Sequence, residues 1–491
     1  MVNNDMEILN LLDRPGHTNF PKLIRPGDIY VDKTSIIQKL LADRFCAVLL
    51  SRPRRFGKSL LISTLEHILK GDKAKFKTLD IGRDDSGYDW KSSHVIRLDM
   101  SRYGIDEKNF AHDLSVDLWK IANLSGIDLY SSGSGALLAG LIGKLYKNYQ
   151  DITLDGADDI VKADSPYVAV LIDEYDFPLV MNLDDRNALN KMLKFFVEFY
   201  ASLNSMSKKT RLISITGITR FEKFTSFSSM KRFRDISFDH DYSKICGFTK
   251  EEIKTNFKDE LEQACETLKA DNSLGCQDSS GEIVDLLMDW YSGYSWDEKN
   301  KVLNPISVLY FFDSFRFGRY WYDTGSSSFL QEFQINGESF FKNFINNRDY
   351  RVSITYPQTK KMSPAGFLLT TGYLTVDKAE GVTGGGHVSK TYSLAVPNME
   401  VRASYVQDHI VGSLFPNISD DEQTGFVNLS KKFCNNLCDI NADGAADRLS
   451  SILSIIPYDC HNGLESFYKS HLNTALAFMR GLAVAGDHSE D

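Results

Sequence analysis

Three residue types that suit phosphate binding stand together in the stretch AVLLSRPRRFGKSLLISTLEHIL, which begins at Ala47. The stretch predicts a buried strand, a basic loop and a helix that opens near Gly57, Lys58 and Ser59. Backbone N–H groups at a helix N-terminus attract phosphate, and Lys58 would reach the β and γ oxygens as a point charge. Gly57 lets the backbone come close without a side-chain clash, and the Ser59 hydroxyl suits Mg²⁺. The stretch therefore predicts a triphosphate-binding loop.

The loop departs from the pattern G-x-x-x-x-G-K-[ST] at its first position, where Arg52 replaces glycine. Taken alone, RPRRFGKS is a partial match, and a basic turn before a helix is the alternative interpretation. Arg52, Arg54 and Arg55 would either add positive charge around a triphosphate or bind Asp and Glu partners that shape the loop. The sequence leaves both possibilities open.

An acidic pair follows a second apolar run, YVAVLIDEYD, at residues 167–176. Asp173 at the end of a buried strand would orient the water shell of Mg²⁺, and Glu174 would act as a general base. The separation from Lys58 is long for one strand–helix–strand unit, so it leaves room for an extra strand and helical insertions. A surface acidic pair after a core strand is the alternative.

A third strand-like run ends in SITGITRF. Thr216 or Thr219 would contact the γ-phosphate or the attacking water, and Arg220 would stabilise developing charge within the chain or across a subunit. A salt bridge at a strand end is the alternative for Arg220. The basic cluster MKRFRD at residues 230–235 is an arginine finger, a DNA contact or a solvated basic face.

Apolar runs at residues 46–51, 94–100, 167–173 and 211–218 alternate with amphipathic helical patterns. This alternation predicts an α/β fold with a parallel sheet covered on both faces. Residues 247–346 have mainly helical patterns, and residues 347–414 combine a helix with a hairpin, the outline of a winged helix. We predict four regions, at residues 1–246, 247–346, 347–414 and 415–491.

The composition is that of an ordinary globular protein, with a net charge of -10 over 491 residues. No global field draws such a chain to nucleic acid or anionic membrane, so such contacts need a local patch. The seven cysteines are scattered without CxxC pairs, which favours free thiols in a reducing compartment. The sequence has no apolar run of about 20 residues and no signal-peptide character. We predict a cytoplasmic protein with no membrane contact.

The motifs YVDKT, RPRRFGKSL, LIDEYDFPL, TGITRFEKFTSFS, ICGFT, WYSGYSW, NPISVL and TGYLTV follow one another in this order. Together they resemble the bacterial AAA-ATPase-like family whose members carry a C-terminal PD-(D/E)XK nuclease domain. In that family RPRRFGKS serves as the Walker A motif, so Arg52 would be a family trait. The resemblance implies a P-loop AAA/ASCE-type sheet that binds ATP and Mg²⁺, followed by a helical lid and a winged-helix-like module.

The site residues follow from these motifs. We predict catalytic roles for Lys58, Asp173, Glu174 and Arg220, and metal binding by Ser59 and Asp173. The nucleotide-binding residues would be Tyr30, Asp32, Arg55, Phe56, Gly57, Lys58, Ser59, Leu60 and Thr216. In related ATPases a segment ahead of the P-loop strand contacts adenine, and Tyr30 and Asp32 lie at a comparable place. The alternative for Asp32 is a cap on the helix KTSIIQKLL.

The region after residue 415 resembles a linker and the entry helix of the nuclease domain, with Glu465 as that helix's acid. Such nucleases also need an Asp on one strand and a D/E-x-K on the next, to hold Mg²⁺ and position water. After Glu465 the sequence contains only Lys469, and no D/E-x-K follows. We expect the nuclease centre to be absent from residues 1–491, either because the gene ends early or because the domain continues beyond them.

The resemblance leads to a first hypothesis, an ATP-hydrolysing regulatory ATPase that controls an attached DNA nuclease in defence against foreign or mobile DNA. The alternative is a nucleotide-gated DNA-binding or oligomerisation module without significant hydrolysis. A nuclease acting by itself is disfavoured by the missing D/E-x-K. DNA contacts through the winged helix or the basic cluster, and a homo-oligomer, are the predicted partners. The DNA substrate, the trigger and the number of subunits stay open.

Overall fold

The computed structural model describes residues 18–25, 27–43, 47–149, 163–183, 185–219, 233–270, 280–324, 352–356, 364–384 and 387–405.

A five-stranded parallel sheet forms the centre of the first region. The apolar runs predict four of its strands, and they do not predict the fifth, at Arg234–Asp235. Its strands are β1 (Ala47–Ser51), β2 (Val95–Asp99), β3 (Val168–Asp173), β4 (Thr210–Gly217) and β5 (Arg234–Asp235), in the spatial order β2-β3-β4-β1-β5. Every pair of neighbours is parallel. In space, β4 lies between β1 and β3. In the sequence, the long stretch between Lys58 and Asp173 contains one extra strand, β2, as its length allowed. The arrangement is compatible with a P-loop AAA-like domain.

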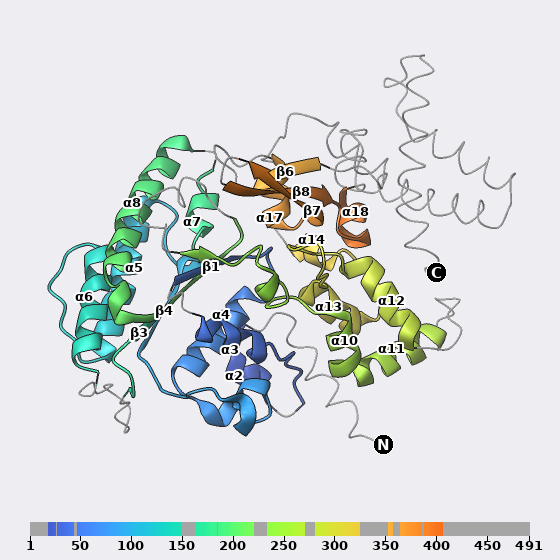
Figure 1. Cartoon of the computed structure of the whole chain (residues 1–491), viewed down its shortest axis with the longest axis horizontal. Coiled ribbons are helices and arrows are strands. Elements are labelled where there is room, and N and C mark those ends of the chain that lie inside the picture. Colours follow the sequence, from blue (N-terminus) through green and yellow to red (C-terminus); the bar gives the residue numbers. More distant parts are fainter. Residues whose placement is uncertain are drawn as a thin grey trace, which may run out of the picture.

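Helices cover both faces of this sheet (Figure 1). The helices α5 (Glu107–Leu124), α6 (Ser134–Lys147) and α8 (Arg186–Ser205) share a core with Ala47 and Leu49 of β1, whereas α3 (Thr34–Ala42) and α4 (Lys58–Leu69) share another core with Val48 and Leu50. Alternate residues of one strand therefore meet opposite layers. This double burial is why β1 and β3 have continuous apolar sequences.

Short elements complete the first region. They are the helices α2 (Phe20–Leu23) and α7 (Phe177–Val180) and the 3₁₀ turns at Lys73–Phe76, Asp80–Gly82, Asp84–Ser86, Met100–Arg102, Ser207–Lys209 and His240–Tyr242.

The described part of residues 247–346 is helical, as its patterns predict. It contains α10 (Lys250–Asn256), α11 (Lys258–Ala270), α12 (Ser280–Tyr291), α13 (Pro305–Ser314) and α14 (Tyr320–Thr324). Helix α10 begins with a capping box, in which the Thr249 hydroxyl accepts the Glu252 N–H and the Glu252 carboxylate accepts the Thr249 N–H. Phe257, Leu287 and Phe311 belong to a separate hydrophobic core between these helices.

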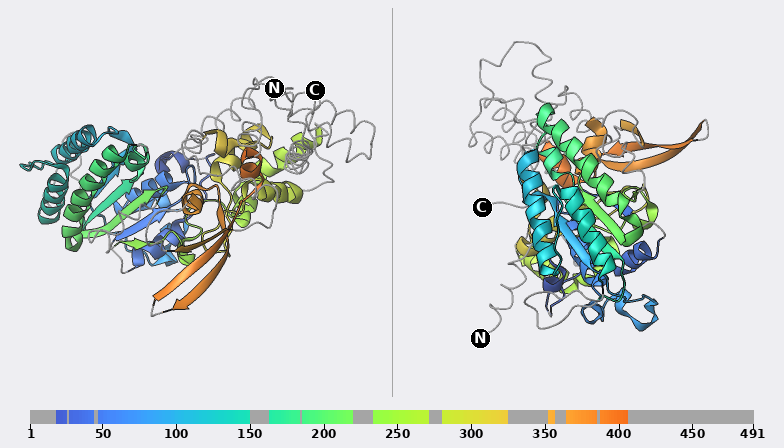
Figure 2. Two further views of the ribbon diagram at one scale, coloured as in Figure 1. Left: turned by 90° about the horizontal axis from the view of Figure 1, so that it is seen from above. Right: turned by 90° about the vertical axis from the view of Figure 1, so that its left-hand side faces the viewer.

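An antiparallel sheet follows, with β6 (Val352–Tyr356), β7 (Thr375–Gly384) and β8 (His387–Ala395) in the order β6-β8-β7. Helix α17 (Pro364–Thr371) precedes β7, α18 (Met399–Tyr405) follows β8, and the β7–β8 hairpin projects from the body (Figure 2). The predicted helix and the two antiparallel strands are present, and the residues of the predicted turn between them, 385 and 386, lie outside the described ranges. However, Phe367, Leu368 and Leu369 of α17 are buried, and α17 contains no basic residue. Helix α17 thus offers no basic surface for DNA.

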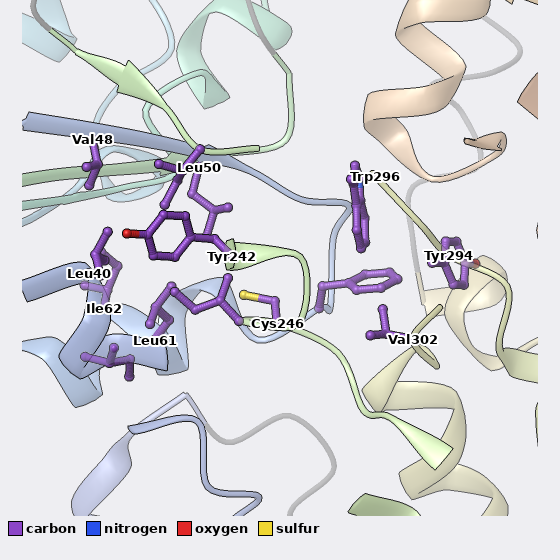
Figure 3. Close-up of a cluster of buried hydrophobic side chains, with 14 of the residues drawn as sticks. Leu40, Val48, Leu50, Leu61, Ile62, Tyr242, Cys246, Tyr294, Trp296 and Val302 are labelled. Atoms are coloured by element: carbon purple, nitrogen blue, oxygen red, sulfur yellow. The ribbon is translucent and has the colours of Figure 1, made fainter. Parts of the chain in front are cut away.

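One hydrophobic core runs from the parallel sheet into the later regions. Figure 3 shows it passing from Leu50 below the sheet, through Tyr242 and Cys246, to Trp296 and Val302. The same cluster includes buried residues of α17, β7 and β8. The packing therefore has no break at residue 246, and the division into four regions stays a prediction.

Two further features concern the described ranges. None of their helices combines the length and apolar character that crossing a bilayer requires. Cys246 and Cys265, the two cysteines described, are free thiols, as predicted for them.

Candidate nucleotide-binding site

The loop that joins β1 to α4 has a backbone shape that requires glycine at one position. Gly57 has φ +94° in the left-handed region, where side chains are strained. A Cβ added there would meet no atom within 4 Å. Conformation rather than crowding therefore calls for glycine. Arg55 also has a positive φ, 65°, so the loop turns sharply at two places.

The N-terminus of α4 presents backbone donors that suit an anion. The first N–H groups of a helix have no acceptor within it, and Gly57 brings no side chain to cap them. The Leu61 N–H donates to the Gly57 carbonyl at 2.9 Å. The N–H groups of Lys58, Ser59 and Leu60 precede that bond. Together with the helix dipole they fit a phosphate group.

Lys58 links the loop to the acidic end of β3. Its side chain is 3% exposed, and Nζ lies 3.5 Å from Oε1 of Glu174. The same Nζ donates to the carbonyl of Pro53 at 3.1 Å. Two segments far apart in the sequence therefore share one polar centre, in which Lys58 is buried and Glu174 is half-buried.

Asp173 is held from two sides at the end of β3. Its Oδ1 accepts the Thr216 hydroxyl at 2.6 Å and the Glu174 N–H at 3.1 Å. Ile172 pairs with Ile215 in the parallel register of β3 and β4, which places Thr216 beside the acid. Because parallel strands end at the same edge of a sheet, the carboxyl ends of β1, β3 and β4 meet here.

Glu174 combines an unusual backbone with an unusual environment. Its φ is +49°, rare for a residue with a side chain and common at functional sites. Burial raises the pKa of Glu174; Lys58 opposes that rise, Asp176 and Asp173 add to it, and Arg54 opposes it. A carboxylate whose pKa lies above its ordinary value is a stronger base than an exposed one.

Asp176 belongs to this centre, and the sequence reasoning missed it. It is fully buried, and its Oδ2 accepts the Ile218 N–H at 3.0 Å, the Thr219 N–H and the Thr219 hydroxyl at 2.6 Å. A Cβ on Gly217 would lie 2.5 Å from Oδ1 of Asp176, so the backbone approaches the acid closely. Asp176 therefore fixes the turn after β4. Its place in the run IDEYD was the available signal.

The threonines considered together in the sequence have different partners. Thr216 bonds to Asp173, whereas Thr219 bonds to Asp176, and the Thr219 carbonyl accepts the Tyr175 hydroxyl at 2.8 Å. Thr216 is thus the one in contact with the acid proposed for metal binding.

The predicted loop residues differ in what their side chains reach. Phe56 is buried, with its ring 4.8 Å from that of Tyr294 and 5.8 Å from that of Trp296, so its side chain is part of the core. Ser59 and Leu60 are half-buried and Arg55 is exposed. Of these, Phe56 would reach a nucleotide only through its backbone.

Arg52 fits neither of the two roles considered for the loop arginines. Its side chain is buried and donates to the carbonyls of Ser51, Ser237 and Tyr242. It therefore adds no accessible charge around a phosphate, and its hydrogen bonds go to backbone rather than to acids.

Tyr30 and Asp32 lie on the α4 side of the sheet. The Tyr30 hydroxyl is 3.2 Å from Oγ1 of Thr64 on α4. Both carboxylate oxygens of Asp32 accept backbone N–H groups at 2.7 Å, one from Thr34 and one from Asp80. The N-cap of α3 is Lys33, one residue after the predicted cap Asp32, although the Asp32 carboxylate does accept the N–H of the first helical residue, Thr34. The adenine contact stays a prediction.

Several predicted residues lie outside the described ranges. These are Arg220, the first three residues of the cluster MKRFRD (230–232), and Glu465 and Lys469 with the rest of residues 406–491. Arg234 of the cluster is described, and it forms ion pairs with Asp43 and Asp239. Its charge is therefore engaged within the chain.

No group of three or more His, Cys, Asp and Glu side chains gathers as a metal site within the described ranges. The predicted Mg²⁺ ligands, Ser59 and Asp173, supply one hydroxyl and one carboxylate. This donor set suits Mg²⁺, which keeps several waters and binds through one or two carboxylates plus substrate phosphates.

Comparison with known proteins adds a family match. Residues 14–227 match the model of the AAA-ATPase-like family, described as predicted AAA-ATPase. The chain is 27% identical over 405 residues to an uncharacterized protein in the vnfD 5′ region of Azotobacter chroococcum mcd 1, covering 82% of this chain and 70% of that protein. No solved structure matches. The family match includes the loop and the ends of β3 and β4, and it ends before the region that resembles a nuclease.

Proposed function

We propose that this chain binds ATP with Mg²⁺ where the loop at residues 52–57 meets the end of β3, and that it hydrolyses the bound ATP. The observation that carries this proposal is the position of Lys58 Nζ, 3.5 Å from Glu174 Oε1 and 3.1 Å from the Pro53 carbonyl. The match of residues 14–227 to a predicted AAA-ATPase family supports it.

Binding would rest on the N-terminus of α4. The backbone N–H groups of Lys58, Ser59 and Leu60 and the ammonium of Lys58 would hold the phosphates. Ser59 and Asp173 would hold Mg²⁺, which neutralises phosphate charge when bound. The hydroxyl of Thr216 keeps the Asp173 carboxylate in place.

Hydrolysis would rest on Glu174. A triphosphate competes with this carboxylate for the charge of Lys58, so nucleotide binding would release Glu174 to accept a proton from water. The buried environment that raises its pKa favours that role. Asp176 would keep the end of β4 in register with Asp173 and Glu174. Arg220 stays a predicted source of charge for the transition state.

The test is ATP turnover by the full chain in four forms: wild type, Lys58→Ala, Glu174→Gln and Lys70→Ala. Lys70 follows the last residue of α4 and forms an exposed pair with Glu66, so it is a matched control for loss of a lysine. We expect Lys58→Ala and Glu174→Gln to lose turnover by on the order of 100-fold or more, and Lys70→Ala to keep it. Equal rates in all four forms would refute the proposal.

Finer parts of the proposal rest on the sequence resemblance. They are a helical lid in residues 247–346, a winged-helix-like module, and control of a DNA nuclease in defence against foreign or mobile DNA. Plasmid cleavage assays with and without ATP address the nuclease, and salt-dependent DNA binding addresses the module. ATP binding without turnover in the wild type would instead favour the nucleotide-gated module.

A further inference from the structure

Arg52 takes the place of a glycine in the phosphate-loop pattern, and its side chain has no exposed surface. Its Nη1 donates to the carbonyls of Ser51 and Ser237, both at 2.8 Å, and Nη2 donates to the carbonyl of Tyr242 at 3.2 Å. The guanidinium thus joins the end of β1 to the segment that follows β5. Burial lowers the pKa of Arg52 to about 10, so the group is charged at neutral pH.

The guanidinium also stacks on a residue from a later region. Cζ of Arg52 lies 3.9 Å from the ring centroid of Trp296, which stands between α12 and α13. Phe56 packs against the same indole, and its carbonyl accepts the Gly247 N–H at 3.2 Å. Figure 3 shows Trp296 in the core that continues from Cys246 and Tyr242. Both ends of the loop are therefore fastened to this core.

The middle of the loop meets the later regions as well. The Trp321 indole N–H donates to the Arg54 carbonyl at 3.1 Å. A Cβ on Gly372 would lie 2.8 Å from Cβ of Pro53, so that glycine permits close packing on the loop. The Pro53 carbonyl is in turn the acceptor for Lys58 Nζ. The loop thus lies between the phosphate-binding lysine and residues far along the chain.

Two simpler roles for Arg52 do not fit these contacts. A phosphate ligand needs a guanidinium that reaches the site, but this one is closed to solvent and bonded to three carbonyls. A residue that only fills space needs no charge, and burying a charge costs free energy unless its hydrogen bonds are made. The side chain holds two backbone segments, the end of β1 and the stretch after β5, and one indole at fixed positions.

We propose that Arg52 is a positioning residue of the nucleotide site, which holds residues 53–57 in their phosphate-accepting shape through Ser237, Tyr242 and Trp296. Nucleotide affinity then depends on the packing of Trp296, although this indole lies in another part of the fold. The inference rests on the proposed nucleotide site and adds to it a way for residues 292–303 to regulate that site. By linkage, occupancy of the site also affects the packing of Trp296.

The experiment compares the wild type with Arg52→Lys, Trp296→Leu and a matched control, Arg211→Lys. Arg211 also donates to a backbone carbonyl, that of Lys91, and to the hydroxyls of Ser93 and Tyr88, but near the start of β4, at the opposite edge of the sheet. All four proteins are titrated with ATP and Mg²⁺ by calorimetry. Hydrogen exchange of the backbone amides of residues 54–60 is measured without nucleotide.

We expect Arg52→Lys and Trp296→Leu to weaken ATP binding on the order of 10- to 100-fold, since hydrogen bonds to charged groups and buried cation–π contacts each contribute at that level. Both should speed amide exchange in the loop, and Arg211→Lys should change neither quantity. Wild-type affinity and wild-type exchange in the two variants would overturn the inference, as would equal losses in Arg211→Lys. If Arg52→Lys does not fold, Trp296→Leu decides. If the wild type binds no ATP, the proposed function fails, while the exchange measurement still decides the positioning role.

Discussion

Replacing Glu400 with glutamine should flatten the pH dependence of stability. Glu400 on α18 is fully buried, and its carboxylate accepts the Trp321 N–H at 2.7 Å and the Ser307 hydroxyl at 2.9 Å. Burial raises the pKa of Glu400 to about 8, whereas the Trp321 and Ser307 donors and Arg319 lower it and Asp323 raises it. The folded protein therefore holds a proton that the unfolded chain releases near pH 4.5.

The sign and size of the change in unfolding free energy with pH follow from proton linkage. Because the folded-state pKa is the higher one, the stabilisation is complete below the unfolded pKa and is lost as the pH rises through about 8. Between pH 6 and pH 9 the wild type should lose about 3 kcal/mol of unfolding free energy through this group. Glutamine resembles the protonated acid and does not titrate, so Glu400→Gln should lose none of that amount.

The assay is urea unfolding of both proteins at a series of pH values. The unfolding free energy of Glu400→Gln is subtracted from that of the wild type at each pH. The subtraction removes the titrations that the two proteins share, so the slope of the difference against pH reports the titration of Glu400. A difference that stays constant from pH 6 to pH 9 would refute the reasoning. The result also bears on the loop, since Trp321 contacts both Glu400 and the Arg54 carbonyl.

Three further changes test the packing by urea unfolding. Gly217→Ala should destabilise the protein by about 1–3 kcal/mol, because its new Cβ would stand 2.5 Å from Asp176 and the Tyr175 ring; an unchanged midpoint would contradict that geometry. Leu171→Ala, at a fully buried position of β3, should cost about 2–5 kcal/mol, and a loss below about 1 kcal/mol would mean that the position is not in a packed core. Lys33→Met breaks the largely buried pair with Glu252, at 2.6 Å, and should cost about 1–3 kcal/mol because the carboxylate loses its partner. The double variant with Glu252→Gln should recover part of that loss, and full additivity would show that the two side chains do not interact.

Strands β1 to β4, and the proximity of the loop RPRRFGKS to the acids that end β3, could be predicted because the residues concerned have characteristic local sequences. The apolar runs of β1 and β3 are buried on both faces, and such strands have unbroken hydrophobic sequences. The loop with Gly57 and Lys58, and the acids after β3, have the residue types that phosphate and metal chemistry require. The structure then brings Lys58 to Glu174.

The fifth strand and the roles of Arg52 and Asp176 could not be predicted, because they depend on contacts between residues far apart in the sequence. Strand β5 is two residues long, Arg234–Asp235, and exists because β1 offers it a free edge. Arg52 donates hydrogen bonds to backbone carbonyls, which every residue has and which therefore leave no signal in the sequence. It also stacks on an indole in another region. Asp176 bonds to the turn after β4. In each case the partner is identified only once the strand order is known.

Equilibrium binding of ATP in the presence of Mg²⁺ tests the central claim most directly, with the wild type, Lys58→Ala and Glu174→Gln compared by calorimetry. If the helix start at Lys58 and the carboxylates that end β3 hold one triphosphate between them, Lys58→Ala should bind at least about tenfold more weakly. Glu174→Gln should bind as tightly as the wild type or more tightly, because it removes the carboxylate that pairs with Lys58 in the structure. Equal affinities for the wild type and Lys58→Ala, or no binding by the wild type, would contradict the claim.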